Sequence, residues 1–223
     1  MMETGQSIVW DLPTRLFHWT LVVLIAAQYA SGEFGLLSME WHFRLGYATL
    51  ALVVFRVLWG FAGSTTSRFA AFVRGPGAVV RYVRDVLAVR AAPAFGHNPL
   101  GGWSVLLMLA SVFVQSLSGL FTSDDLTETG PLAAHVSDAT VKWLTSVHHV
   151  NRYVLLLLII GHVVAVAMYR VVRRENLVAP MWHGRARRVD DAPMRVAPLW
   201  RALVLLAASA AAVGWLVVFG GDA

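Results

Sequence analysis

Long apolar runs separated by short polar stretches dominate the sequence. Five of them can be drawn, at residues 16–32, 41–61, 102–121, 147–172 and 199–219. Each is about long enough to cross a hydrocarbon core of roughly 30 Å as a helix, the first only just. The pattern predicts an all-α integral membrane protein built as one helical bundle. Residues 16–32 are expected to be a retained span, because no basic segment or clear cleavage site accompanies them.

Composition agrees with a membrane protein and narrows the cofactor chemistry. The chain is 57% hydrophobic, with a mean hydropathy of +0.62, well above soluble proteins. It contains no cysteine, which excludes disulfides, thiolate iron–sulfur sites and covalently attached c-type haem. Any redox cofactor must therefore be held without thioether or thiolate bonds.

The charged residues predict the orientation of the spans. Loops 62–101 and 173–198 carry arginines at 68, 74, 81, 84 and 90 and at 173, 174, 185, 187, 188 and 195. The opposite loops carry Glu33, Glu40, Asp124, Asp125, Glu128 and Asp138 against a single Lys142. The positive-inside rule then places the N-terminus in the cytoplasm and the C-terminus outside. Topology accounts for the pI of about 10.2, and no nucleic-acid-binding motif is present.

Shorter patterns predict the connecting segments. Valines and arginines alternate at helical spacing after the break at 75–77, which predicts a short helix on the inner membrane surface. Residues 96–99 form a turn into the third span. The outer stretch HVSDATVKWL, at 135–144, is expected to be helical and capped.

The run 147–172 holds two histidines at membrane depth, where ionisable groups usually mark a functional site. His148 and His162 are fourteen residues apart, about 40° short of four turns, so both rings leave one helix face. The rise between them is roughly 21 Å, so one ring lies near each side of the membrane. His149 fails this test, being about 140° away from His162.

Two more histidines complete depth-matched pairs. His18 lies at the cytoplasmic end of the first span, as His162 does, and His42 lies at the outer end of the second, as His148 does. Two histidines from different helices at one depth are what bis-imidazole ligation of a b haem requires. Zinc is a weaker alternative, because no carboxylate or thiolate joins either pair. The remaining histidines, His97, His135, His149 and His183, are expected to be interfacial or off-face.

Residues near these pairs fit a flat dianionic ligand. Gly46 lies one turn after His42, where a missing side chain leaves room. Haem carries two propionates, which arginines bind well. Arg15 and Arg56 are the expected partners on the inner side, and Arg44 or Arg152 on the outer side.

The chain resembles the bacterial cytochrome b561 and nickel–iron hydrogenase cytochrome b superfamily. The resemblance rests on VWDLPTRLFHW (9–19), WHFRLGYATLALVVFRVLWGFAG (41–63), SRFAAFVRGP (67–76), GHNPLGG (96–102), VHHVNRY…GHVVAVAMY (147–169) and ENLVAPMWHGR (175–185). It implies a four-helix core with two b haems, the inner one ligated by His18 and His162 and the outer one by His42 and His148. Two features depart from the family pattern. His149 stands where a glutamate is common, and a fifth span follows residue 198.

The expected organisation and function follow from these observations. Residues 1–172 form the di-haem core, 173–198 a cytoplasmic linker, and 199–223 a fifth span with a short outer tail. Such a chain in the bacterial cytoplasmic membrane would carry electrons between the quinone pool, with ubiquinone as the candidate quinone, and an outside partner such as a periplasmic c-type cytochrome. Two alternatives stay open: a superoxide:quinone oxidoreductase, and the membrane anchor of a dehydrogenase or hydrogenase. A transporter is a distant reading, since no inverted repeat is visible.

Overall fold

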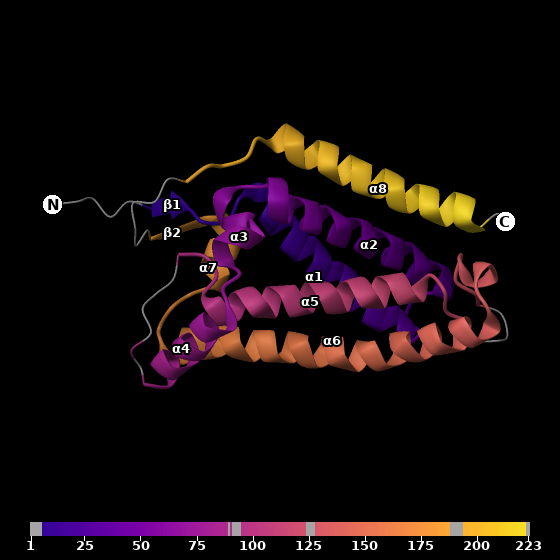
Figure 1. Ribbon diagram of the computed structural model, residues 1–223, viewed down its shortest axis with the longest axis horizontal. Helices are drawn as coiled ribbons and strands as arrows, with labels where there is room; N and C mark the ends of the chain where they lie inside the picture. The colour runs from indigo at the N-terminus through magenta and orange to yellow at the C-terminus, as the bar shows by residue number, and fades with distance from the viewer. Residues whose placement is uncertain (1–5, 89, 91–94, 124–127, 188–193, 222–223) are drawn as a thin grey trace.

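A bundle of long helices forms the body of the protein in the computed structural model, which describes residues 6–88, 90, 95–123, 128–187 and 194–221 (Figure 1). The bundle consists of α1 (Leu12–Gly32), α2 (Met39–Ala62), α5 (Pro99–Gly119) and α6 (Asp138–Val172). A further long helix, α8 (Leu199–Gly221), packs along the outer side of α2. The prediction of a helical membrane protein is confirmed.

Helix α2 is the centre of the packing, because it contacts α1, α5 and α8. Phe55 and Trp59 of α2 are buried against Phe17 of α1 and Leu109 of α5. Val53 is fully buried beside Val112 and Leu155. The apolar faces of three neighbours therefore meet on one helix, which fixes the spacing of the bundle.

Four helices are long and apolar enough to cross a membrane within the described residues: α2, α5, α6 and α8. Helix α1 has 21 residues but does not reach the same apolar composition. Its sequence includes Arg15, His18, Gln28 and Tyr29, and these polar side chains lower its hydropathy. His18, Gln28 and Tyr29 belong to the sites described below. The low hydropathy of α1 therefore reflects side chains that these sites use.

A buried carboxylate holds the N-terminal end of α1 in place. Asp11 is 3% exposed and caps α1 by accepting a 2.9 Å hydrogen bond from the Thr14 amide. Its second oxygen accepts 3.1 Å bonds from the Trp59 indole and the Ser67 hydroxyl. A carboxylate with all these donors stabilises the junction of α1, α2 and the following turn.

The same end of the bundle is closed by short elements from distant parts of the sequence. Strand β1 (Gln6–Ile8) pairs antiparallel with β2 (Arg185–Arg187), which follows α7 (Val178–His183). Gly184 joins α7 to β2 with a φ of 84°, and a Cβ there would lie 2.8 Å from the Trp10 carbonyl oxygen. Only glycine fits this approach without strain. Segment 173–198, expected to be a linker, thus contributes to this end of the bundle.

The predicted connecting elements are present. The surface segment forms α4 (Pro76–Leu87), which is tied to α6 by a 2.5 Å hydrogen bond between the Tyr82 and Tyr169 hydroxyls. Short helices η1 (Thr65–Ser67) and α3 (Phe69–Phe72) precede it. Asn98 caps α5 through the Gly101 amide at 2.8 Å.

The outer connection also matches the expectation of a capped helix. Ser137 caps α6 through the Thr140 amide at 3.3 Å, after the short helix η2 (Ala133–His135). Because α6 begins at Asp138, it is nine residues longer at this end than the predicted run, and the DATVKWL part of HVSDATVKWL forms its first turns. At 35 residues it is about 52 Å long, so it extends beyond the hydrocarbon core.

The orientation gives the first testable prediction. A reporter fused after Ala223 should read as external and one inserted at 76–88 as cytoplasmic, because of the arginine distribution. The end of α8 lies opposite β1 along the long axis, as this topology requires (Figure 1). Paired alkaline phosphatase and fluorescent-protein fusions at both points measure it. A cytoplasmic signal after Ala223 would mean that α8 does not span.

Candidate functional site

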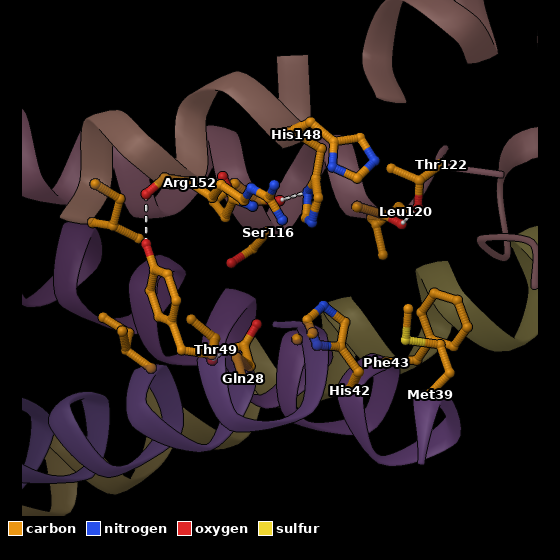
Figure 2. Close-up of a pocket in the computed structure, with 18 of the residues that line it drawn as sticks. Gln28, Met39, His42, Phe43, Thr49, Ser116, Leu120, Thr122, His148 and Arg152 are labelled. Carbon is orange, nitrogen blue, oxygen red and sulfur yellow. Dashed lines mark hydrogen bonds between the residues drawn. The ribbon is translucent and has the colours of Figure 1, made fainter. Parts of the chain in front are cut away.

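Two histidines from opposite sides of the bundle face each other near the end at which α2 begins. This end is called the outer end below, and the end at which α1 begins is called the inner end. His42 of α2 and His148 of α6 have ring centroids 6.4 Å apart. Figure 2 shows both rings pointing into the space between their helices. That space belongs to a cavity of about 220 Å³ with walls from α1, α2, α5 and α6.

The second predicted pair is also brought together. His18 of α1 and His162 of α6 have ring centroids 6.5 Å apart. Both pairs share α6, so His148 and His162 point into the bundle at two depths, roughly 21 Å apart along the helix. The depth pairing expected from the sequence agrees with this geometry.

The separation of the rings suits two imidazoles on opposite sides of one metal. A metal–imidazole bond is about 2 Å long and the ring radius is roughly 1.1 Å, so centroids of trans imidazoles lie about 6.2 Å apart. The two observed separations are 6.4 and 6.5 Å. Each gap is therefore wide enough for one metal ion between the two imidazoles.

Hydrogen bonds determine which nitrogen of each outer ring faces the gap. His148 Nδ1 lies 2.9 Å from the Gln115 carbonyl, which can only accept, so Nδ1 carries the proton. Ser31 Oγ donates to the Gln28 carbonyl at 2.9 Å and therefore accepts from His42 Nδ1 at 2.8 Å. Both Nε2 atoms keep a free lone pair for a metal.

Glycines keep the outer gap open. A Cβ on Gly32 would lie 3.1 Å from Cε1 of His42, and one on Gly119 would lie 3.1 Å from Cε1 of His148. Gly46, predicted to leave room, lines the same cavity, and a Cβ there would meet only Gln28 Oε1, at 3.9 Å. The site therefore has a glycine beside each outer histidine and a third on the wall, as a flat macrocycle requires.

On the inner side, Arg56 is a buried cation with one unpartnered guanidinium nitrogen. Its side chain is 2% exposed and lies over the Phe69 ring, 5.2 Å from the centroid. Its buried Nη1 has no hydrogen-bond partner among the described residues, while the Asp11 carboxylate interacts with the guanidinium electrostatically. A buried N–H without an acceptor is unfavourable, so an anionic group of a bound ligand would suit this nitrogen.

The other predicted arginines differ in their surroundings. Arg15 donates from Nη1 to the Trp182 carbonyl at 2.5 Å, which ties α1 to α7, while its buried Nε has no partner in the described chain. Arg152 lines the outer cavity and pairs with Glu33. Arg44 is exposed, pairs with Glu40 and does not line the cavity. Of the two outer candidates, the structure brings only Arg152 to the histidine pair.

His97 was predicted to be interfacial, but it lies within the inner group. Its ring is 4.6 Å from both Trp10 and Phe72. Burial, then Arg56, then His162 lower the pKa of His97 to about 3, so the ring is neutral at physiological pH. Its buried Nδ1 has no partner among the described residues. The motif GHNPLGG was the one sequence signal for this residue.

Comparison with known protein families indicates which kind of cofactor these gaps are built for. The model of the prokaryotic cytochrome b561 family matches residues 9–184. The chain belongs to the prokaryotic cytochrome b561 family. A search of curated proteins found no match.

Membership confirms the resemblance expected from the sequence and implies a membrane b-type cytochrome that transfers electrons. The residues present fit b haem: an imidazole from each of two helices at each gap, glycines beside the outer rings, and buried arginine nitrogens suited to propionates. Sequence reasoning singled out the histidines that the structure pairs, and of the two outer arginines it named, the structure brings only Arg152 to the cavity. It missed the role of Ser31 and the contacts of Gly32, Gly119 and His97.

Ligation gives the second prediction. His42→Ala or His148→Ala should remove the outer haem and spare much of the inner one, while His18→Ala or His162→Ala should do the reverse. The reason is the facing geometry of each pair. Haem content and the visible spectrum of each purified variant measure the loss.

His149→Ala serves as the matched control, since this exposed ring also lines the outer cavity but leaves α6 about 100° away from His148. It should keep both haems. Loss of the outer haem in His149→Ala together with its retention in His148→Ala would overturn the assignment.

Proposed function

We propose that this cytochrome carries electrons across the membrane through two b haems, between the quinone pool and a redox partner outside. His18 and His162 hold the inner haem, and His42 and His148 the outer one. The observation that supports this most directly is the presence of two metal-spaced histidine pairs at opposite depths of one bundle. Each haem, when bound, supplies one-electron iron chemistry.

The protein residues position these groups. The shared helix α6 sets the separation along the membrane normal, and the Nδ1 hydrogen bonds of the outer pair hold its rings in place. On the inner side, Arg56 and Arg15 offer positive charge for propionates. Val53, Val112 and Leu155 pack α2, α5 and α6 against one another inside the bundle.

The charge of the outer face favours a basic protein as the outside partner. Residues 31–41 hold two acids and no base, and residues 122–147 hold four acids and one lysine, a net charge of −5. Two of the acids, Glu33 and Glu40, pair with Arg152 and Arg44, which leaves −3. Asp124 and Asp125 lie outside the described residues. An acidic face attracts a carrier such as a basic c-type cytochrome and repels a small anion such as superoxide.

Electron exchange at different ionic strengths provides the third prediction. Rapid mixing of the reduced cytochrome with a basic c-type cytochrome should give a rate that falls as salt rises from low to physiological strength. The physical reason is screening, since the Debye length falls from about 30 Å at 0.01 M to about 8 Å at 0.15 M. An acidic carrier of similar potential is the control and should show the opposite salt dependence. Reduction of the haems by superoxide near the diffusion limit would contradict the carrier and favour a superoxide:quinone oxidoreductase.

A further inference from the structure

The two histidine pairs differ in what holds their Nδ1 atoms. Both outer rings donate to an acceptor, His42 to Ser31 at 2.8 Å and His148 to the Gln115 carbonyl at 2.9 Å. Ser118 Oγ lies 3.3 Å from the same His148 nitrogen. On the inner side, His18 Nδ1 is buried without a partner in the described part of the chain.

Cross-helix bonds hold the outer acceptors in place. Asn151 of α6 donates to the Ser111 carbonyl at 2.9 Å and to Gln115 Oε1 at 2.8 Å. Gln28, whose carbonyl binds Ser31, donates from Nε2 to Thr49 Oγ1 at 2.7 Å. The outer acceptors thus belong to a polar hydrogen-bond network, and such a network is energetically unfavourable to place within a membrane. Among the described residues, no comparable network surrounds the inner histidine pair.

The charged side chains around the two histidine pairs also differ, and their effect on the haem potentials has the same sign as that of the hydrogen bonds. The outer cavity is lined by Glu33 and Glu128 against Arg152, one net negative charge. Near the inner pair, Arg56 and Arg15 stand against Asp11, one net positive charge. Positive surroundings favour the reduced state of an iron centre, and negative surroundings favour the oxidised state.

A hydrogen bond from Nδ1–H makes an imidazole a more basic ligand, which stabilises Fe(III) over Fe(II). We propose that Ser31 and the Gln115 carbonyl, acting through His42 and His148, give the outer haem a lower midpoint potential than the inner haem. Electron transfer from the outer to the inner site is then downhill in the absence of a membrane potential. Ser31 is a positioning residue in this scheme, and the inference rests on the proposed di-haem function.

Potentiometric titration of the purified protein tests the order of the potentials. The native chain should give two one-electron steps in its visible spectrum. Ser31→Ala removes the acceptor for His42 and should raise the lower step, leaving the higher step in place. We expect a threefold to tenfold change in the Fe(III)/Fe(II) ratio, roughly 30–60 mV for a one-electron couple. Ser118→Ala should move the same step upward by less, because its contact is longer.

Ser209→Ala is the matched control, because this serine is 1% exposed and bonds only its own helix, at the Leu205 carbonyl in α8. It should move neither step. An independent assignment comes from His42→Ala, whose remaining inner haem should titrate at the higher step.

The outcomes separate this inference from the proposed function. A shift of the higher step in Ser31→Ala, no shift in either serine variant near the outer pair, a remaining low-potential haem in His42→Ala, or a single unresolved step from two haems would overturn the potential order while two haems persist. A haem content below two per native chain would instead contradict the di-haem function itself.

Discussion

The pairing of imidazoles across the bundle is the constraint on which the rest of the structure depends. An ionisable ring within a membrane is unfavourable unless it is bonded, and four such rings meet in two gaps of 6.4 and 6.5 Å. Helix α6 supplies one ring to each gap, so its phase fixes where α1 and α2 can pack. The glycines beside His42 and His148 then follow, because any side chain there would crowd the rings.

The two ends of the bundle surround their histidine pairs with different groups. The outer site is held by a network of serine, amide and backbone groups, with its arginine paired to Glu33. The inner site lies beside the buried Arg56, whose Nη1 has no hydrogen-bond partner among the described residues, at the end of the bundle built from β1, β2 and α7. Helix α1 joins both, and its polar side chains explain why it is not among the described helices that are apolar enough to cross a membrane by composition.

Much of this arrangement was predictable from the sequence, for identifiable reasons. The spacing of His148 and His162 on one helix gives their depths directly, and the charge pattern assigns His18 and His42 to the same depths. The contacts of Ser31, Gly32 and Gly119 were not predictable, because they depend on which helix packs opposite each position. His97 was read as an interfacial loop residue, since its place between Trp10 and Phe72 depends on how the loop folds back. From the sequence, Arg44 and Arg152 were equally good candidates for the outer site. Only the rotation of each helix about its axis shows that Arg152 lines the cavity and Arg44 does not.

The central claim is that both gaps hold haem at the same time, each iron bound on both sides by imidazole. The most direct measurement is the ratio of haem b to polypeptide in the purified protein, together with the spin state from its visible spectrum. The account predicts two haems per chain, both six-coordinate and low-spin. A ratio of one, or a high-spin five-coordinate signal from either site, would contradict it.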